Sequence, residues 1–182
     1  NLFESQYLLD LAKGTGPIRN PHVAHIGTDA PTIIPKREID EVSPVIACVT
    51  SGAPHKRNDV VLDAFRKFSA SCPAARLKLI GEADHIRSTL SEADRDYLSN
   101  NARIELTGYI DREELFQQLA RATCLVTASE LESFFMVAIE AMRVGCPVVA
   151  TDVSSIRESV GEHALLFAPR DSDDAARLIE RA

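Results

Sequence analysis

The order of apolar and polar positions divides the chain, from about residue 45 onward, into short apolar runs that alternate with longer amphipathic runs. Several short runs are almost continuously apolar, which is typical of strands covered on both faces of a sheet. The short runs predict strands at 45–49, 77–80, 104–106, 124–127, 147–150 and 165–167. The amphipathic runs predict helices at 60–69, 86–98, 112–120, 134–142, 155–160 and 175–181.

This alternation of strands and helices with short connections predicts an α/β fold with a doubly wound parallel sheet, that is, a Rossmann-like domain. The helix at 112–120 has a clear start, because Asp111 precedes it as a candidate N-cap and Glu114 follows three residues later. The start of a second helix, at 175–181, is marked by the acidic run at 171–174.

Residues 1–44 follow a different pattern. Leu2, Leu8, Leu9 and Leu11 predict an amphipathic helix, and the glycines and prolines after them predict loops. We therefore divide the chain into a lead-in at 1–44, made of an N-terminal helix and a loop-rich stretch, and a Rossmann-like domain at 45–182.

Length and composition narrow the class of protein. The 182 residues are enough for one full-sized domain, and 45% hydrophobic with 26% charged residues is ordinary for a globular protein. A net charge of −7 argues against binding to nucleic acid through bulk charge, and no apolar run approaches the ~20 residues that span a bilayer. The four cysteines have no metal-ligand spacing, which favours a cytoplasmic protein with reduced thiols. Because the chain begins at Asn1 and ends inside a predicted helix, we expect it to be part of a longer protein.

The strongest chemical signal is one acidic residue in an apolar helix. Glu140 is the only polar position between Phe134 and Met142, and a buried carboxylate is unfavourable by several kcal/mol unless it is paired. Glu132 lies eight residues earlier, about 12 Å away along a helix with a rise of ~1.5 Å per residue. With Ser133 as a candidate N-cap, a diphosphate at the helix start would leave one carboxylate at each end of the ligand. That arrangement suits a nucleotide sugar, with ribose at Glu140 and the transferred sugar at Glu132.

A second candidate anion site follows the strand at 45–49. Lys56 and Arg57 lie at its carboxyl end, where open parallel sheets bind ligands, and their charges would neutralise a diphosphate. His55 beside them is a candidate further anion contact.

Each of these signals also has a purely structural interpretation. Glu140 could face solvent or pair with an arginine such as Arg143, and the residues at 55–57 could be a solvated loop. The aromatic residues of the apolar helix fit a core. Two Asp-x-Asp patterns, at 94–96 and 171–173, are better explained by a polar helix and by a helix start than by a metal.

Together these segments resemble the donor-site signature of family 4 retaining glycosyltransferases of the GT-B fold. Glu132-x(7)-Glu140, between Ser129 and the segment 145–152, resembles the core of that signature. The other matching stretches are the lysine segment at 55–65, the base-contacting stretch at 106–110 with 113–115 and Ala122, the segments 153–158 and 165–167, Pro169 and, more weakly, 25–29. The match spans about 45–182, which the resemblance identifies as the C-terminal half of such an enzyme. It implies that 45–182 is the nucleotide-sugar-binding domain and that 1–44 is a lead-in from the interdomain region.

The resemblance implies a role for each matching residue. Lys56 would hold the donor diphosphate, Glu140 the nucleotide ribose and Glu132 the donor sugar, with Lys56 and Glu132 as the catalytic residues. Backbone amides after Glu132 would receive the phosphate. The remaining expected donor-site residues are Arg57, Ser51, Gly52, Ser129, Ser133, Phe134, Phe135, Met136, Val137, Tyr109 and Ile110.

The resemblance also implies partners. The nucleotide-diphosphate sugar is a substrate, and neither a cofactor nor a catalytic metal is expected. An acceptor sugar, lipid or glycan would bind an N-terminal domain that this chain lacks, so the fragment alone is expected to be inactive. The whole enzyme would work in the cytoplasm, with association at the inner face of the membrane as an option, and without nucleic acid.

Two departures from the family pattern keep other functions open. Ser51 stands where the family usually has an arginine, and Phe135 where it commonly has a glycine that lets backbone approach phosphate closely. The alternatives are a non-catalytic GT-B-like binding module with a degenerate donor site, or another GT-B enzyme such as a nucleotide-sugar epimerase or a phosphorylase.

Overall fold

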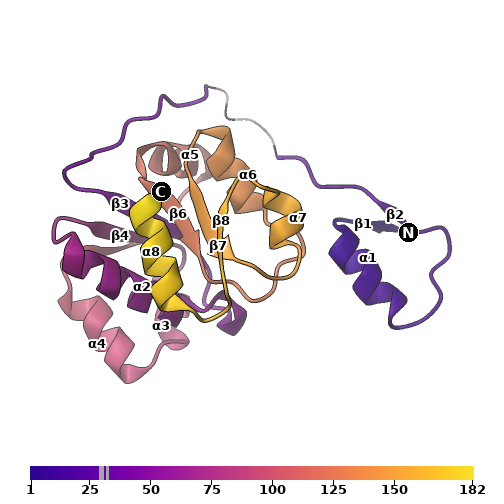
Figure 1. Cartoon of the computed structure of the whole chain (residues 1–182), viewed down its shortest axis with the longest axis horizontal. Coiled ribbons are helices and arrows are strands. Elements are labelled where there is room, and N and C mark those ends of the chain that lie inside the picture. The colour runs from indigo at the N-terminus through magenta and orange to yellow at the C-terminus, as the bar shows by residue number, and fades with distance from the viewer. Residues whose placement is uncertain (29–30, 32) are drawn as a thin grey trace.

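A six-stranded parallel sheet with helices on both faces forms the body of the computed structural model, which describes residues 1–28, 31 and 33–182 (Figure 1). The strand order is β5-β4-β3-β6-β7-β8. The strands are β3 (Val45–Val49), β4 (Arg76–Ile80), β5 (Ile104–Gly108), β6 (Cys124–Thr127), β7 (Val148–Thr151) and β8 (Leu165–Phe167). All adjacent pairs in this sheet are parallel, which confirms the predicted doubly wound α/β fold.

Two apolar cores explain why the strands are apolar almost without interruption. Ile46 and Cys48 of β3 point into one core, whereas Ala47 between them points into the other. The first core is covered by α2 (Asn58–Ser71), α3 (Ala83–Ser88), α4 (Glu92–Asn100) and α8 (Ser172–Arg181). The second is covered by α5 (Arg112–Arg121), α6 (Met136–Arg143) and α7 (Ile156–Val160).

The direction in which the chain adds strands reverses between β3 and β6. From β3 the sheet grows through β4 to β5, and from β6 it grows the other way through β7 to β8. Parallel sheets of this kind bind ligands in the crevice outside the carboxyl ends of the strands at such a switch point. The loops that leave β3 and β6 therefore border the expected ligand crevice. The first of them contains the one-turn 3₁₀ helix η1 (Pro54–Lys56).

The lead-in forms a small unit of its own beside the sheet (Figure 1). Two short strands, β1 (Leu2–Phe3) and β2 (His22–Val23), pair in parallel, and the helix α1 (Gln6–Lys13) lies in the chain segment that connects them. Leu2, which we expected in the helix, is thus in β1. Asp29, the last residue of the weaker family match, lies outside the described residues.

Several predicted elements differ from the observed ones in their bounds; the last helix, for example, begins at Ser172 rather than Ala175. The single helix expected at 86–98 is two helices, α3 and α4, because Ser91 interrupts the run and caps α4 by accepting the Asp94 N–H at 3.1 Å. The helix expected from Phe134 begins at Met136, and the last strand but one begins at Val148. The predicted N-cap Asp111 is confirmed, since its carboxylate accepts the Glu114 N–H at 2.9 Å.

No helix in the described part of the chain is both long enough and apolar enough to cross a membrane.

Candidate functional site

A pocket of about 300 Å³ opens between the loops that follow β3 and β6. Seven of the predicted site residues line it together with Val49 and Thr50: Ser51, Lys56, Glu132, Phe134, Phe135, Met136 and Val137. The structure thus brings together the lysine, the first glutamate of the signature and the start of α6, which are separated by up to 80 positions in the sequence. We call this cavity the Lys56 pocket.

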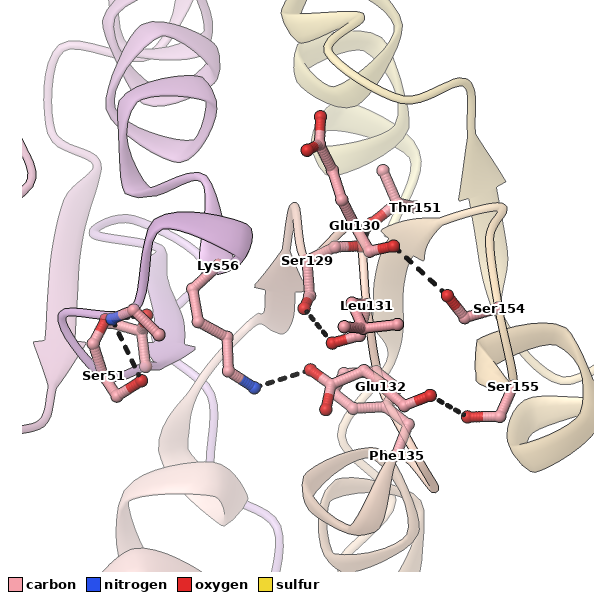
Figure 2. A network of polar contacts seen from close by, with 12 residues as sticks. Ser51, Lys56, Ser129, Glu130, Leu131, Glu132, Phe135, Thr151, Ser154 and Ser155 are labelled. Carbon is pink, nitrogen blue, oxygen red and sulfur yellow. Dashed lines mark hydrogen bonds and ion pairs between the residues drawn. The ribbon is translucent and has the colours of Figure 1, made fainter. Parts of the chain in front are cut away.

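The two charged residues of the Lys56 pocket face each other. Lys56 Nζ lies 2.6 Å from Glu132 Oε1, and the two side chains are 23% and 13% exposed (Figure 2). Sequence reasoning gave them different parts of one ligand and did not anticipate this contact. In this state the carboxylate compensates the charge of the ammonium group, so an incoming diphosphate would compete with Glu132 for Lys56.

Three hydroxyl groups, one from the last residue of β7 and two from the loop after it, hold the backbone that carries Glu132. Thr151 Oγ1 donates to the Ser129 carbonyl at 2.6 Å, Ser154 Oγ to the Glu130 carbonyl at 3.2 Å and Ser155 Oγ to the Glu132 carbonyl at 2.9 Å, as Figure 2 shows. Sequence reasoning missed these three residues as site residues. Their signals in the sequence are their place in the segments 145–152 and 153–158 of the family match and the hydroxyl side chains that follow a predicted strand.

Ser129 and Ser133 have roles other than the expected ones. Ser129 is fully buried and its hydroxyl donates to the Leu131 carbonyl at 3.1 Å, so it shapes the loop rather than the pocket wall. Ser133 is not the N-cap of α6, because Phe135 occupies that position without a capping side chain. The carbonyl of Ser133 instead accepts the Ser5 hydroxyl at 2.8 Å.

The amides at the start of α6 are partly occupied. The Phe135 N–H donates to Ser159 Oγ at 3.0 Å, and the Met136 N–H donates to the Phe134 carbonyl at 2.9 Å in a tight turn. The Val137 N–H has no acceptor within its own helix, as is usual for a first turn. The side chain of Phe135 is 98% buried and belongs to the core beneath α6, so it bounds the pocket without filling it.

A second pocket of about 290 Å³ adjoins the Lys56 pocket, and Val49 and Thr50 line both. Its other lining residues are Ile80, Gly81, Gly108, Tyr109, Ile110, Arg112 and Leu115, which leave it largely apolar. Tyr109 and Ile110, the residues that the family resemblance assigns to the base, thus line one cavity. We call this cavity the Tyr109 pocket.

Glu140 is largely shielded from solvent and paired. Its side chain is 12% exposed, and its Oε1 lies 3.0 Å from Arg112 Nη2 and 3.5 Å from Thr28 Oγ1. Its ion-pair partner in the described structure is thus Arg112 of α5 rather than Arg143. Because Arg112 also lines the Tyr109 pocket, this ion pair places the second glutamate of the signature beside that pocket.

Arg57 and Gly52 do not line the Lys56 pocket. Arg57 takes the left-handed conformation (φ 48°), and its guanidinium bonds Asp59 at 2.6 and 2.9 Å and Glu130 at 3.3 Å. The hydrogen bonds to Asp59 raise the pKa of Arg57. Gly52 is required by packing, because a Cβ there would lie 2.0 Å from the His85 carbonyl oxygen.

The other candidate groups are structural where the structure describes them. No cluster of three or more His, Cys, Asp or Glu side chains in the described residues is placed to hold a metal ion. Asp94 pairs with Arg66, and Asp171 caps α8 by accepting the Asp174 N–H. Cys48 is a buried free thiol whose pKa is raised to about 12 by burial.

Comparison with known proteins identifies the family of this chain. The profile of the family described as glycosyl transferases group 1 matches residues 29–182. The serotype-specific mannosyltransferase WbdA of Escherichia coli is 24% identical over 174 residues, which are 90% of this chain and 21% of that protein. Mannosylfructose-phosphate synthase of Agrobacterium fabrum is 31% identical over 130 residues, which are 67% of this chain and 29% of that protein. The chain therefore spans less than a third of the length of these curated relatives.

Among solved structures, HepE of Anabaena in complex with UDP and glucose has a TM-score of 0.75 at 22% identity, covering 99% of this chain and 52% of that one. At this identity the likeness shows the fold, and the fold is the one found in GT-B glycosyltransferases. The family profile covers the whole sheet and both pockets. The chain belongs to the group 1 family of glycosyl transferases.

Proposed function

We propose that this chain is the C-terminal, donor-binding domain of a family 4 retaining glycosyltransferase, which transfers a sugar from a nucleotide-diphosphate sugar to an acceptor. One observation carries the proposal: the polar Lys56 pocket and the apolar Tyr109 pocket share Val49 and Thr50 at the switch point of the sheet. A nucleotide sugar has the matching order of parts, with an uncharged aromatic base, whose ring faces pack against apolar side chains, at one end and a charged diphosphate towards the other.

The charges around these pockets support a role for each group. Transfer breaks the bond between the anomeric carbon and the diphosphate, whose oxygen takes the electron pair and leaves with negative charge. Lys56, once released from Glu132, stabilises that charge, and the positive end of the α6 dipole adds to it. Glu132 accepts hydrogen bonds from hydroxyls of the donor sugar, and Glu140 accepts them from the ribose in place of Arg112. The protein thus supplies the positive charge for the leaving group without needing a metal ion.

The whole enzyme would contain a further domain. On this proposal an N-terminal domain binds the acceptor sugar, lipid or glycan, and the reaction takes place between the two domains in the cytoplasm or at the inner face of its membrane. The chain alone then binds nucleotide and transfers nothing.

Calorimetric titration of the chain with UDP, GDP and ADP tests the proposal. Binding of one of them in the micromolar range, lost in Glu140→Ala, is the expected result. The matched control is Glu180→Ala, which removes an exposed carboxylate from α8, on the other side of the sheet, and should leave binding unchanged. Absence of binding by all three nucleotides to a folded chain would contradict the proposal.

Specific observations favour a non-catalytic binding module as the second candidate. The amides of Phe135 and Met136 already have acceptors, and Ser51 provides no charge in the Lys56 pocket. A folded wild-type chain that ignores all three nucleotides would support this candidate over the first.

A further inference from the structure

A third pocket, of about 580 Å³, lies next to the Lys56 pocket and plays no part in the proposed donor site. Its lining comes from η1, the start of α2, the turn between α3 and α4, and the loops after β6 and β8. The two pockets are separated where the Glu130 N–H donates to the His55 carbonyl at 2.7 Å. Figure 2 shows the Glu130 carboxylate directed away from the pair formed by Lys56 and Glu132. We call this cavity the Glu130 pocket.

Two arginines converge on Glu130. Arg170 Nε lies 2.5 Å and Arg57 Nη1 lies 3.3 Å from Glu130 Oε1. Both arginines have a positive φ, 48° for Arg57 and 66° for Arg170. This conformation is unfavourable by roughly 1–2 kcal/mol for an L-residue and nearly free for glycine. Their presence at two strained positions indicates that the guanidinium groups themselves are useful in the pocket.

The charge balance of the Glu130 pocket selects among ligand classes. Asp59 and Glu130 are paired with its two arginines, and Asp94 is paired with Arg66. Compensated charges disfavour both a free anion, such as phosphate, and a free cation. Its lining residues are polar apart from Pro54, but the apolar stems of their side chains also border the cavity.

Neutral polyhydroxylated molecules fit such a lining. A sugar hydroxyl can donate to a carboxylate and accept from a guanidinium at the same time. It therefore binds both members of an ion pair, and neither charge loses a partner. Thr89 and Ser91 also line the pocket, and because their hydroxyls already donate to the Ile86 carbonyl and the Asp94 carboxylate, they offer a ligand oxygen acceptors only. The volume lies within the range of small-molecule sites and is larger than either pocket proposed for the donor.

We propose that the Glu130 pocket binds sugar units of a glycan, at a site separate from that of the nucleotide sugar. Glu130 and Asp59 accept hydrogen bonds from hydroxyls, and Arg57 and Arg170 donate to oxygen atoms of the sugar. On the proposed function, a glycan held at this edge of the sheet would be part of the acceptor chain. The binding itself requires neither a donor nor turnover.

Nuclear magnetic resonance of the ¹⁵N-labelled chain tests this, with mannotriose and maltotriose as sugar probes, inorganic phosphate as the anionic probe and UDP as the probe of the donor site. We expect either trisaccharide to shift the Nε–Hε signals of Arg57 and Arg170. The key variant is Arg170→Gly, which removes one guanidinium while relieving the strain of a positive φ. It should keep the fold and weaken sugar binding about tenfold, the effect of losing one charge-assisted hydrogen bond.

The matched control is Asn20→Gly, a residue of the lead-in that also has a positive φ (47°). It should bind the sugar like the wild type. The proposal fails if neither trisaccharide shifts these signals, if phosphate shifts them instead, or if Arg170→Gly binds sugar undiminished. Because UDP is titrated separately, a failure here is distinguishable from a failure of the donor site.

Discussion

Lys56 and Glu132 are 2.6 Å apart across their pocket, and each compensates the charge that the other would present to a ligand. A diphosphate that enters must replace the carboxylate as the partner of Lys56, and it is repelled by that carboxylate while both are present. We therefore expect the two residues to have opposite effects on nucleotide binding, although the proposed function gives both a part in transfer. The sequence does not show which residue strengthens nucleotide binding and which weakens it, because their contact joins positions 76 residues apart.

The first prediction is that Glu132→Gln tightens the binding of UDP about fivefold. Glutamine keeps the shape of the side chain and removes the competing charge, and a partly buried pair of this kind is worth about 1 kcal/mol. Calorimetric titration measures the change. Lys56→Met is the companion variant and should weaken the binding of UDP by about tenfold or more. A Glu132→Gln variant that binds UDP less tightly than the wild type would show that the pair does not compete with the ligand.

At the scale of elements, the loop after β3 is fixed by close packing on α3. A Cβ on Gly52 would lie 2.0 Å from the His85 carbonyl oxygen, which is backbone and has no room to move. We predict that Gly52→Ala destabilises the fold by about 2–4 kcal/mol and lowers Tm by roughly 5–10 °C. Thermal unfolding followed by calorimetry or circular dichroism measures the fall in Tm. Gly27→Ala is the matched control, since nothing lies within 4 Å of a Cβ there, and an equal loss in both variants would contradict the assignment.

The loop that carries Glu132 depends on another element for its shape. We predict that Ser155→Ala, which leaves the Glu132 carbonyl without its 2.9 Å hydrogen bond, lowers the free energy of unfolding by about 1–2 kcal/mol. Urea denaturation measures the change. Ser88→Ala is the control, because that exposed hydroxyl also donates to a carbonyl and its loss is made good by water. If both variants lose the same stability, burial of the Ser155 bond is not what matters.

The sequence predicted the parallel sheet because strands buried on both faces are recognisable from apolar composition alone. It could not place the start of α6, since Phe134 and Phe135 are apolar and fit the helical period, yet Met136 donates to the Phe134 carbonyl in a tight turn. It placed Lys56 and Glu132 in one site through the family resemblance. Their contact with each other, and that of Glu140 with Arg112, depend on pairing between distant loops, which a local pattern does not encode.

At the scale of the whole molecule, Glu158 of α7 joins the lead-in to the sheet domain. Its carboxylate accepts the N–H groups of Gln6 at 2.7 Å and Tyr7 at 3.1 Å, at the start of α1, and lies 3.0 Å from His25 Nε2. Burial alone would raise the pKa of Glu158, but these hydrogen bonds outweigh it and the pKa is lowered from its ordinary 4.5. A lowered pKa in the folded state means that this docking is fully stabilising above pH 4.5 and is lost as the pH falls through the lowered value.

We therefore predict that acidification releases the lead-in before the sheet unfolds. The amide proton signals of Gln6 and Tyr7 should move upfield as their carboxylate acceptor is protonated, and nuclear magnetic resonance measures this. In Glu158→Gln the same signals should show no such transition. Wild-type signals that stay unchanged until global unfolding would contradict the role of Glu158.

The loop after β6, whose backbone is held by hydroxyl groups, carries one exposed apolar side chain. Leu131 is 49% exposed, its carbonyl accepts the Ser129 hydroxyl, and it directly precedes Glu132 of the Lys56 pocket. Three of the four native thiols are buried and Cys72 is half-buried, so Leu131→Cys would give the molecule its most accessible thiol. A fluorescent dye attached there would sense whatever enters the cavity, which makes the loop a ready mount for an optical reporter of ligand binding.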